Sequence, residues 1–186
     1  MFKNVNSMNI KLSVGILIVM SFLLYACNSS ESGKDADKYC DSVISIQNRA
    51  ITQLDSFFQS TRYRNYSSTE FYKKAQDETI RQIEALKKLG NFHEDNSLHI
   101  ALLHVLTVTD QVLKEEGKVI LELDEQLLAK YDKQKVDQLD SIENIAILKI
   151  QAAQLFFDSV QVQFLTQYGF EVVADSTQYT VKPDLE

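Results

Sequence analysis

Apolar residues recur at steps of three and four along most of this chain, which is the spacing of one face of an α-helix. The first stripe predicts a helix over residues 35–60 and consists of Tyr39, Val43, Ile46, Ala50, Leu54 and Phe57. The run Ser67-Ser68-Thr69-Glu70 has the form of a capping box and predicts the start of a second helix. Gly90 is placed to end that helix as a left-handed C-cap.

Two further stripes follow. Asp95, Asn96 and Ser97 offer caps for a third helix, whose end is unmarked because residues 122–131 contain no Gly or Pro. Its stripe is Leu98, Leu102, Val105, Thr109, Val112 and Val119. The fourth helix, ended by Gly169, has eight apolar positions at the same spacing: Leu139, Ile142, Ala146, Ile150, Ala153, Phe157, Val160 and Phe164.

Four amphipathic helices with short connections predict an all-α fold, an antiparallel four-helix bundle over residues 37–173. None of these helices can bury its apolar stripe alone. Residues 174–186 are polar and contain Pro183, the one proline of the chain. This segment is therefore expected to be a frayed polar C-terminal tail.

The start of the chain follows a different pattern. Residues 1–11 contain Lys3 and Lys11 and no acid, and residues 12–26 are apolar. This apolar run is shorter than the ~20 residues that a membrane span needs, and it ends at a small residue, as a cleaved secretory signal does. We therefore predict a signal peptide over residues 1–26, cut between Ala26 and Cys27. The alternative is a signal anchor with an incidental cysteine.

The sequence Leu24-Tyr25-Ala26-Cys27 resembles the lipobox of bacterial lipoproteins. That resemblance implies a thioether-linked diacylglycerol on Cys27 and an acylated amino end, so that the signal peptide is followed by a lipid anchor. Residues 27–36 are rich in Ser, Asn, Gly and charge and predict a short flexible tether. Asn28 does not match the usual signal for retention in the inner membrane. We therefore expect an outer-membrane lipoprotein, facing either the periplasm or the cell surface.

Charge narrows the range of partners. The chain has 19 basic and 26 acidic residues and a formal net charge of −7. Loss of residues 1–26 removes two lysines and no acid, which makes the mature chain more acidic still. Nucleic-acid binding and flat binding to an anionic membrane both need clustered basic charge, so neither is expected. Membrane contact is expected through the lipid anchor at Cys27.

The three histidines, His93, His99 and His104, do not share one helical face at about 100° per residue. Asp95 and His99 lie one turn apart and offer at most two ligands. The Glu-x-x-His pairs of di-iron bundles and the zincin motif are both absent from the sequence. There is also no phosphate-binding loop, nucleophile elbow or dinucleotide fingerprint. We therefore expect no metal, no cofactor and no enzymatic activity.

Two features have both a structural and a functional interpretation. Cys40 is expected to be a buried structural thiol, the alternative being an intermolecular disulfide. The basic-aromatic cluster formed by Arg62, Tyr63, Arg64 and Tyr66 is expected to lie in a loop, either as a solvated connection or as an interaction site.

The segments "DADKYCDSVISIQNRAITQLDSF", "IEALKKLGNFHEDNSLHIALLHVL" and "FLTQYGFEV" resemble a family of bacterial surface lipoproteins of unknown function, first named from leptospiral members. The resemblance implies a helical domain behind a lipidated cysteine and carries no catalytic signature. The expected function is a membrane-anchored, non-enzymatic binding or structural module with an envelope or surface protein as partner. The alternative is a metal or small-ligand carrier that uses the bundle interior.

Overall fold

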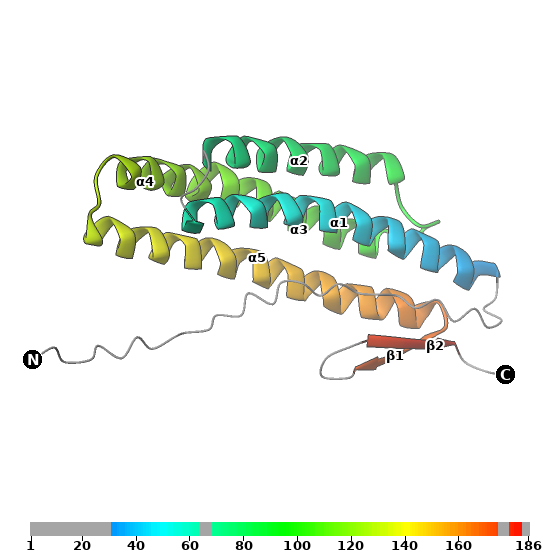
Figure 1. The fold of residues 1–186 in the computed structure, drawn as a ribbon. Helices are drawn as coiled ribbons and strands as arrows, with labels where there is room; N and C mark the ends of the chain where they lie inside the picture. The colour runs from blue at the N-terminus through cyan, green and yellow to red at the C-terminus, as the bar shows by residue number, and fades with distance from the viewer. Residues whose placement is uncertain (1–30, 64–67, 175–178, 184–186) are drawn as a thin grey trace, which may run out of the picture.

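The computed structural model describes residues 31–63, 68–174 and 179–183 (Figure 1). The helices are α1 (Glu31–Tyr63), α2 (Ser68–Leu89), α3 (Ser97–Val112), α4 (Lys118–Ala129) and α5 (Lys133–Gln167), and the π-helical turn η1 (Leu113–Gly117) joins α3 to α4. The predicted helical fold is confirmed. The predicted signal peptide, its cleavage site at Ala26 and Cys27, and residues 27–30 of the tether lie outside the described residues.

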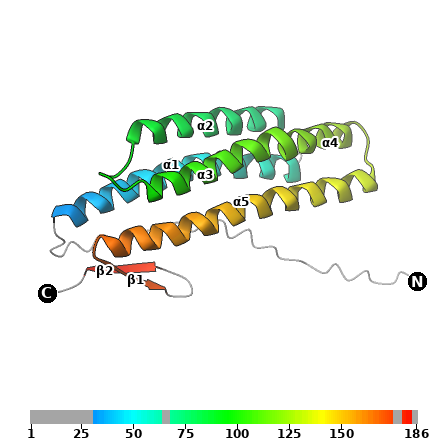
Figure 2. The ribbon, with the colours of Figure 1, turned by 180° about the vertical axis from the view of Figure 1, so that it is seen from behind.

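The helices lie side by side in both views. Figure 2 shows α3 between α2 and α5, and α3 makes contacts with both of them. The apolar stripes meet in two adjoining clusters. One cluster joins the first half of α1 to α3 and the end of α5, and the other joins the second half of α1 to η1, α4 and the first half of α5. Every member of the predicted α1 stripe is buried.

The π-helical turn changes which residue of the third stripe faces the core. We expected Val119 to continue that stripe, but Val119 is 37% exposed and Ile120 is fully buried. A π turn closes on i→i+5 hydrogen bonds and so holds more residues than an α turn. The inward position therefore moves on by one residue. The hydroxyl of Tyr72 donates to the carbonyl of Leu113, the first residue of this turn, at 3.0 Å.

Gly90, Gly169 and Asp95 act at helix ends as predicted, whereas the predicted capping box begins at Ser67, outside the described residues. Gly90 and Gly169 have φ values of +73° and +84°, as left-handed C-caps do. Asp95 Oδ1 accepts a hydrogen bond from the Ser97 amide at 2.8 Å at the start of α3. Asp132 Oδ1 accepts one from the Gln134 amide at 2.9 Å at the start of α5, a cap that we did not predict.

The helix α1 is longer at both ends than the predicted range of residues 35–60, since it runs from Glu31 to Tyr63. Residues 31–34, which we assigned to the flexible tether alone, are therefore helical. Ala36 is fully buried and belongs to the same core cluster as Tyr39 and Val43, which explains why the helix extends this far.

The C-terminal segment also differs from the prediction. The strands β1 (Phe170–Ala174) and β2 (Tyr179–Pro183) pair antiparallel, where we expected a frayed tail from residue 174. The hairpin lies beside the C-terminal end of α5 (Figure 1). Phe170 packs against the core cluster at this end. Pro183 is the last paired residue of β2, a position at which the missing amide proton costs least.

We predict that Gly90→Ala destabilises the protein by about 1 kcal/mol, the cost of placing a Cβ in the left-handed region. A Cβ at Gly90 would meet no atom within 4 Å, so backbone conformation alone sets this cost. Urea unfolding measures it. Gly90→Asn is the matched control and should lose less, because Asn tolerates this conformation. Equal stability of Gly90→Ala and the wild type would contradict the role of Gly90 as a left-handed C-cap.

Candidate functional site: the outward face of α5

The helix α5 is apolar on two opposite sides. Among the described residues it is the one helix long and apolar enough to match a membrane span, yet only 28% of its most apolar window is buried. Its core-facing side contributes several fully or nearly fully buried residues to both core clusters, among them Leu139, Ala146, Ile150, Phe157 and Phe164. The core therefore accounts for only part of the apolar character of α5.

The exposed apolar residues of α5 form a second stripe on the opposite side, which we call the α5 outer stripe. Its members are Ile145, Leu148, Ala152, Leu155 and Phe156, all exposed. Leu148 is 64% exposed and Leu155 is 70% exposed. At about 100° per residue these positions lie roughly opposite Ile150 and Phe157. Contiguous exposed apolar surface of this kind typically marks an interaction site.

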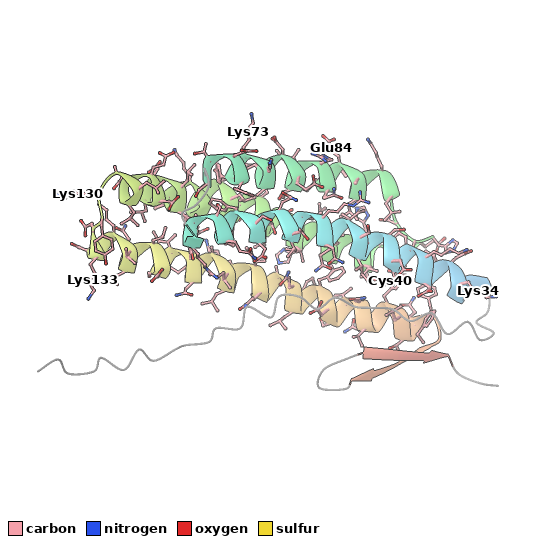
Figure 3. All side chains as sticks on the ribbon, in the orientation of Figure 1. Lys34, Cys40, Lys73, Glu84, Lys130 and Lys133 are labelled. Carbon is pink, nitrogen blue, oxygen red and sulfur yellow. The ribbon has the colours of Figure 1, made fainter. Side chains whose placement is uncertain are left out.

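The outward side of α2 provides a contrast within the same fold. Lys73 and Glu84 project from α2 away from the other helices (Figure 3). A charged outer side is the usual arrangement for a helix that packs on a core with one face only. The outer side of α5 departs from this rule.

Fixed contacts border one edge of the α5 outer stripe. The ring of Phe156 meets that of His104 on α3 edge-on, with centroids 5.8 Å apart. Lys149 Nζ lies 2.6 Å from Glu116 Oε1 and 3.6 Å from Glu115 Oε2, both on η1. The cation nearest to the stripe is thus engaged within the chain.

A buried carboxylate joins α5 to the end of α1. Glu143 is 4% exposed, and its Oε1 accepts a hydrogen bond from Thr61 Oγ1 at 2.6 Å. Its Oε2 lies 3.2 Å from Nε of Arg62. Burial raises the pKa of the Glu143 carboxyl, while the Thr61 hydrogen bond and the Arg62 charge oppose this shift. The cluster fixes the outer stripe relative to the rest of the fold.

The predicted interaction loop is only partly described. Arg62 and Tyr63 form the last turn of α1 and do not lie in a loop, because the α1 helix continues three residues beyond its predicted end. Arg64 and Tyr66 lie outside the described residues. Since Arg62 binds Glu143, one of the two arginines of the cluster has a structural contact. An interaction at this end of the molecule stays a prediction.

The histidines do not come together. His99 Nδ1 lies 3.0 Å from the carbonyl oxygen of Gly90, which also accepts a hydrogen bond from Tyr39 Oη at 2.8 Å. His104 is exposed beside Phe156, and His93 is exposed in the turn between α2 and α3 with a φ of +53°. Across residues 31–63, 68–174 and 179–183, no group of three His, Cys, Asp or Glu side chains is placed to hold a metal ion.

Cys40 is a buried thiol, in agreement with the structural interpretation. It is 1% exposed on α1, and its Sγ lies 3.5 Å from Nε2 of Gln161 on α5 (Figure 3). Burial raises the pKa of this thiol to about 12, and the nearby carboxylates of Asp41 and Asp37 add to the shift. Both its burial and its pKa disfavour thiolate chemistry at Cys40.

Sequence reasoning missed the α5 outer stripe, because it followed only the eight apolar positions of the core stripe and left the apolar residues between them unassigned. A signal was available: Ile145, Leu148, Ala152 and Leu155 recur at steps of three and four in their own right, offset from the core stripe.

Comparison with protein-family models, with curated proteins and with solved structures finds no match for this chain.

We predict that the stability advantage of the wild type over Glu143→Gln falls as the pH rises. The raised pKa of Glu143 means that folding favours its protonated form. The advantage is therefore fully present below the pKa of an unfolded glutamate, near 4.3, and is lost as the pH passes through the folded value. Urea unfolding of both proteins from about pH 4 to about pH 8 measures the difference. Asp137→Asn, at an exposed α5 carboxylate, is the control and should show a much smaller change. If the stability advantage of the wild type stayed constant or grew with rising pH, the raised pKa of Glu143 would be contradicted.

We predict that Cys40 in the folded protein resists thiol reagents at about pH 8 and reacts once urea unfolds the chain. The reason is its burial together with its raised pKa. A Cys40→Ser variant should lose the urea-dependent signal. Rapid labelling of the native protein, or a disulfide-linked dimer that disappears in the variant, would show instead that this thiol is accessible.

Proposed function

We propose that this chain is a lipoprotein anchored by Cys27 to the outer membrane, and that it works as a non-enzymatic binding or structural module. In this proposal an antiparallel four-helix bundle presents the α5 outer stripe as its binding surface. The observation that carries the proposal is the exposure of this stripe on a helix whose opposite side forms the core. A charge-free apolar strip of this kind on an otherwise acidic chain suits a protein partner in the cell envelope.

The bundle arrangement is supported by the course of the chain. The short turn between α2 and α3 and the three-residue connection from Ala129 to Lys133 each reverse the chain, and the helices run side by side in Figures 1 and 2. The unit formed by α3, η1 and α4 then counts as one long helical segment. It contacts α1, α2 and α5.

The anchor is supported by the sequence. The apolar run of residues 12–26 ends at Ala26-Cys27, and the polar residues that follow lead directly into α1. The family resemblance points in the same direction. Surface or periplasmic exposure both agree with a domain that follows its anchor after only a few residues.

The alternative, a metal or small-ligand carrier, has less support. An apolar cavity between α1 and α5, lined in part by Leu54, Phe58 and Ile147, measures about 30 Å³. A space of this size holds little more than a single water molecule. Arg62 also lines this cavity, and the buried carboxylate that it contacts, Glu143, already has its partners within the chain.

We predict that the protein extracted from membranes has the mass of residues 27–186 plus its acyl chains, and that Cys27→Ser abolishes both the cleavage and the added mass. The thioether of the anchor needs the Cys27 thiol, so serine cannot replace it. Intact-mass spectrometry of both proteins is the measurement. A wild-type chain that retains Met1 would show that residues 12–26 serve as a membrane anchor, and the lipoprotein proposal would fall.

A further inference from the structure

We propose that the α5 outer stripe pairs with the same stripe of a second copy of this chain, the two helices running antiparallel. This inference rests on the proposed function, because it names the partner of the binding surface proposed there. The spacing, the side-chain sizes and the charges along α5 all support it.

The spacing of the stripe is that of a coiled-coil seam. From Ser141 to Ser159 the outward positions alternate in steps of four and three, and they are Ser141, Ile145, Leu148, Ala152, Leu155 and Ser159. This repeat averages 3.5 residues, which keeps a narrow seam facing a partner helix over several turns. The apolar part of the seam has a small polar residue at each end.

The sizes of the side chains are self-complementary when two copies run antiparallel about a point near Ile150. Ile145 then faces Leu155 of the second copy, and Leu148 faces Ala152. A large residue meets a small one in the two central layers, so the helices can approach closely there. Parallel pairing would place Leu148 on Leu148 and leave a gap between the two Ala152 residues. A two-fold pair using the same patch on both copies is the commonest form of oligomer.

The charges also favour a second copy over a lipid surface. Lys149 is the one charged residue in the sequence from residue 144 to 157, and its ammonium group is held by Glu115 and Glu116. Pairing of the stripes therefore desolvates no free charge. Helices that lie on membranes carry Lys and Arg along the rim of the apolar face, and this stripe has no such rim.

The expected dimer is reversible. The seam from residue 141 to 159 is about 27 Å long at 1.5 Å per residue. One helix pair of this length buries less than the ~800 Å² per partner of a standard stable interface. Two copies anchored in the same membrane would associate more readily than this area suggests, because anchoring raises their effective concentration.

The first test compares the mature lipidated protein with its Leu148→Glu variant by analytical ultracentrifugation in density-matched detergent. We expect a wild-type dimer that increases with concentration and is weakened at least tenfold by the substitution. Leu128→Glu is the matched control, because Leu128 is 54% exposed on α4, outside the stripe, and the control should dimerise like the wild type. Circular dichroism verifies that both variants keep their helices.

The second test is a rescue experiment. Ala152→Lys should also weaken the dimer, and an equimolar mixture with Leu148→Glu should restore association, since the introduced carboxylate of one copy then faces the introduced ammonium group of the other. A wild-type chain that stays monomeric at every concentration would overturn the inference, and so would a mixture that associates no better than its components. The mass of the same samples reports the lipid anchor separately, so a failed dimer leaves the proposed function standing.

Discussion

The structure depends on a constraint set by α5: this helix has apolar residues on two opposite sides, and the part of the chain that the structure describes covers only one of them. The inner side links both core clusters, with Phe164 in one and Ala146 in the other, so the fold cannot form without it. The outer side is left exposed by the same packing. Burial of apolar surface stabilises a folded chain, and an exposed strip of the same chemistry stabilises a complex for the same reason.

Polar contacts between helices fix the position of this surface. At one end of the fold, the carbonyl of Gly90 receives Tyr39 from α1 and lies beside His99 of α3. Toward the other end, Glu143 of α5 binds the last turn of α1. Each buried acceptor loses water on folding and regains partners only in the native arrangement. These contacts favour one packing of the helices over other packings of the same apolar stripes.

Much of the fold could be predicted from the sequence, because helical periodicity and glycine caps are local signals. The α1 stripe and the ends at Gly90 and Gly169 are confirmed. The shift from Val119 to Ile120 could not be predicted, because the π turn is a departure from the assumed period of 3.6 residues. The partners of Glu143 could not be predicted either, since Thr61 and Arg62 lie about 80 residues away from it in the sequence.

The candidate site was less predictable than the fold. An apolar stripe on a helix indicates that other residues will pack against this stripe. The pattern does not say whether those residues belong to the same chain or to another one. Only the packing around α5 separates its core side from the α5 outer stripe. The proposed lipid anchor is different, since the pattern that predicts it, Cys27 and the residues before it, is local to one stretch of the sequence.

Cysteine cross-linking in membranes tests the central claim most directly. Chains with Leu148→Cys and chains with Ala152→Cys are expressed separately and together, and mild oxidation is followed by non-reducing electrophoresis. Antiparallel pairing of the α5 outer stripes places these two positions opposite one another, so a cross-linked dimer should form strongly only when both chains are present. Equal cross-linking of either chain alone, or no cross-link in the mixture, would contradict the account.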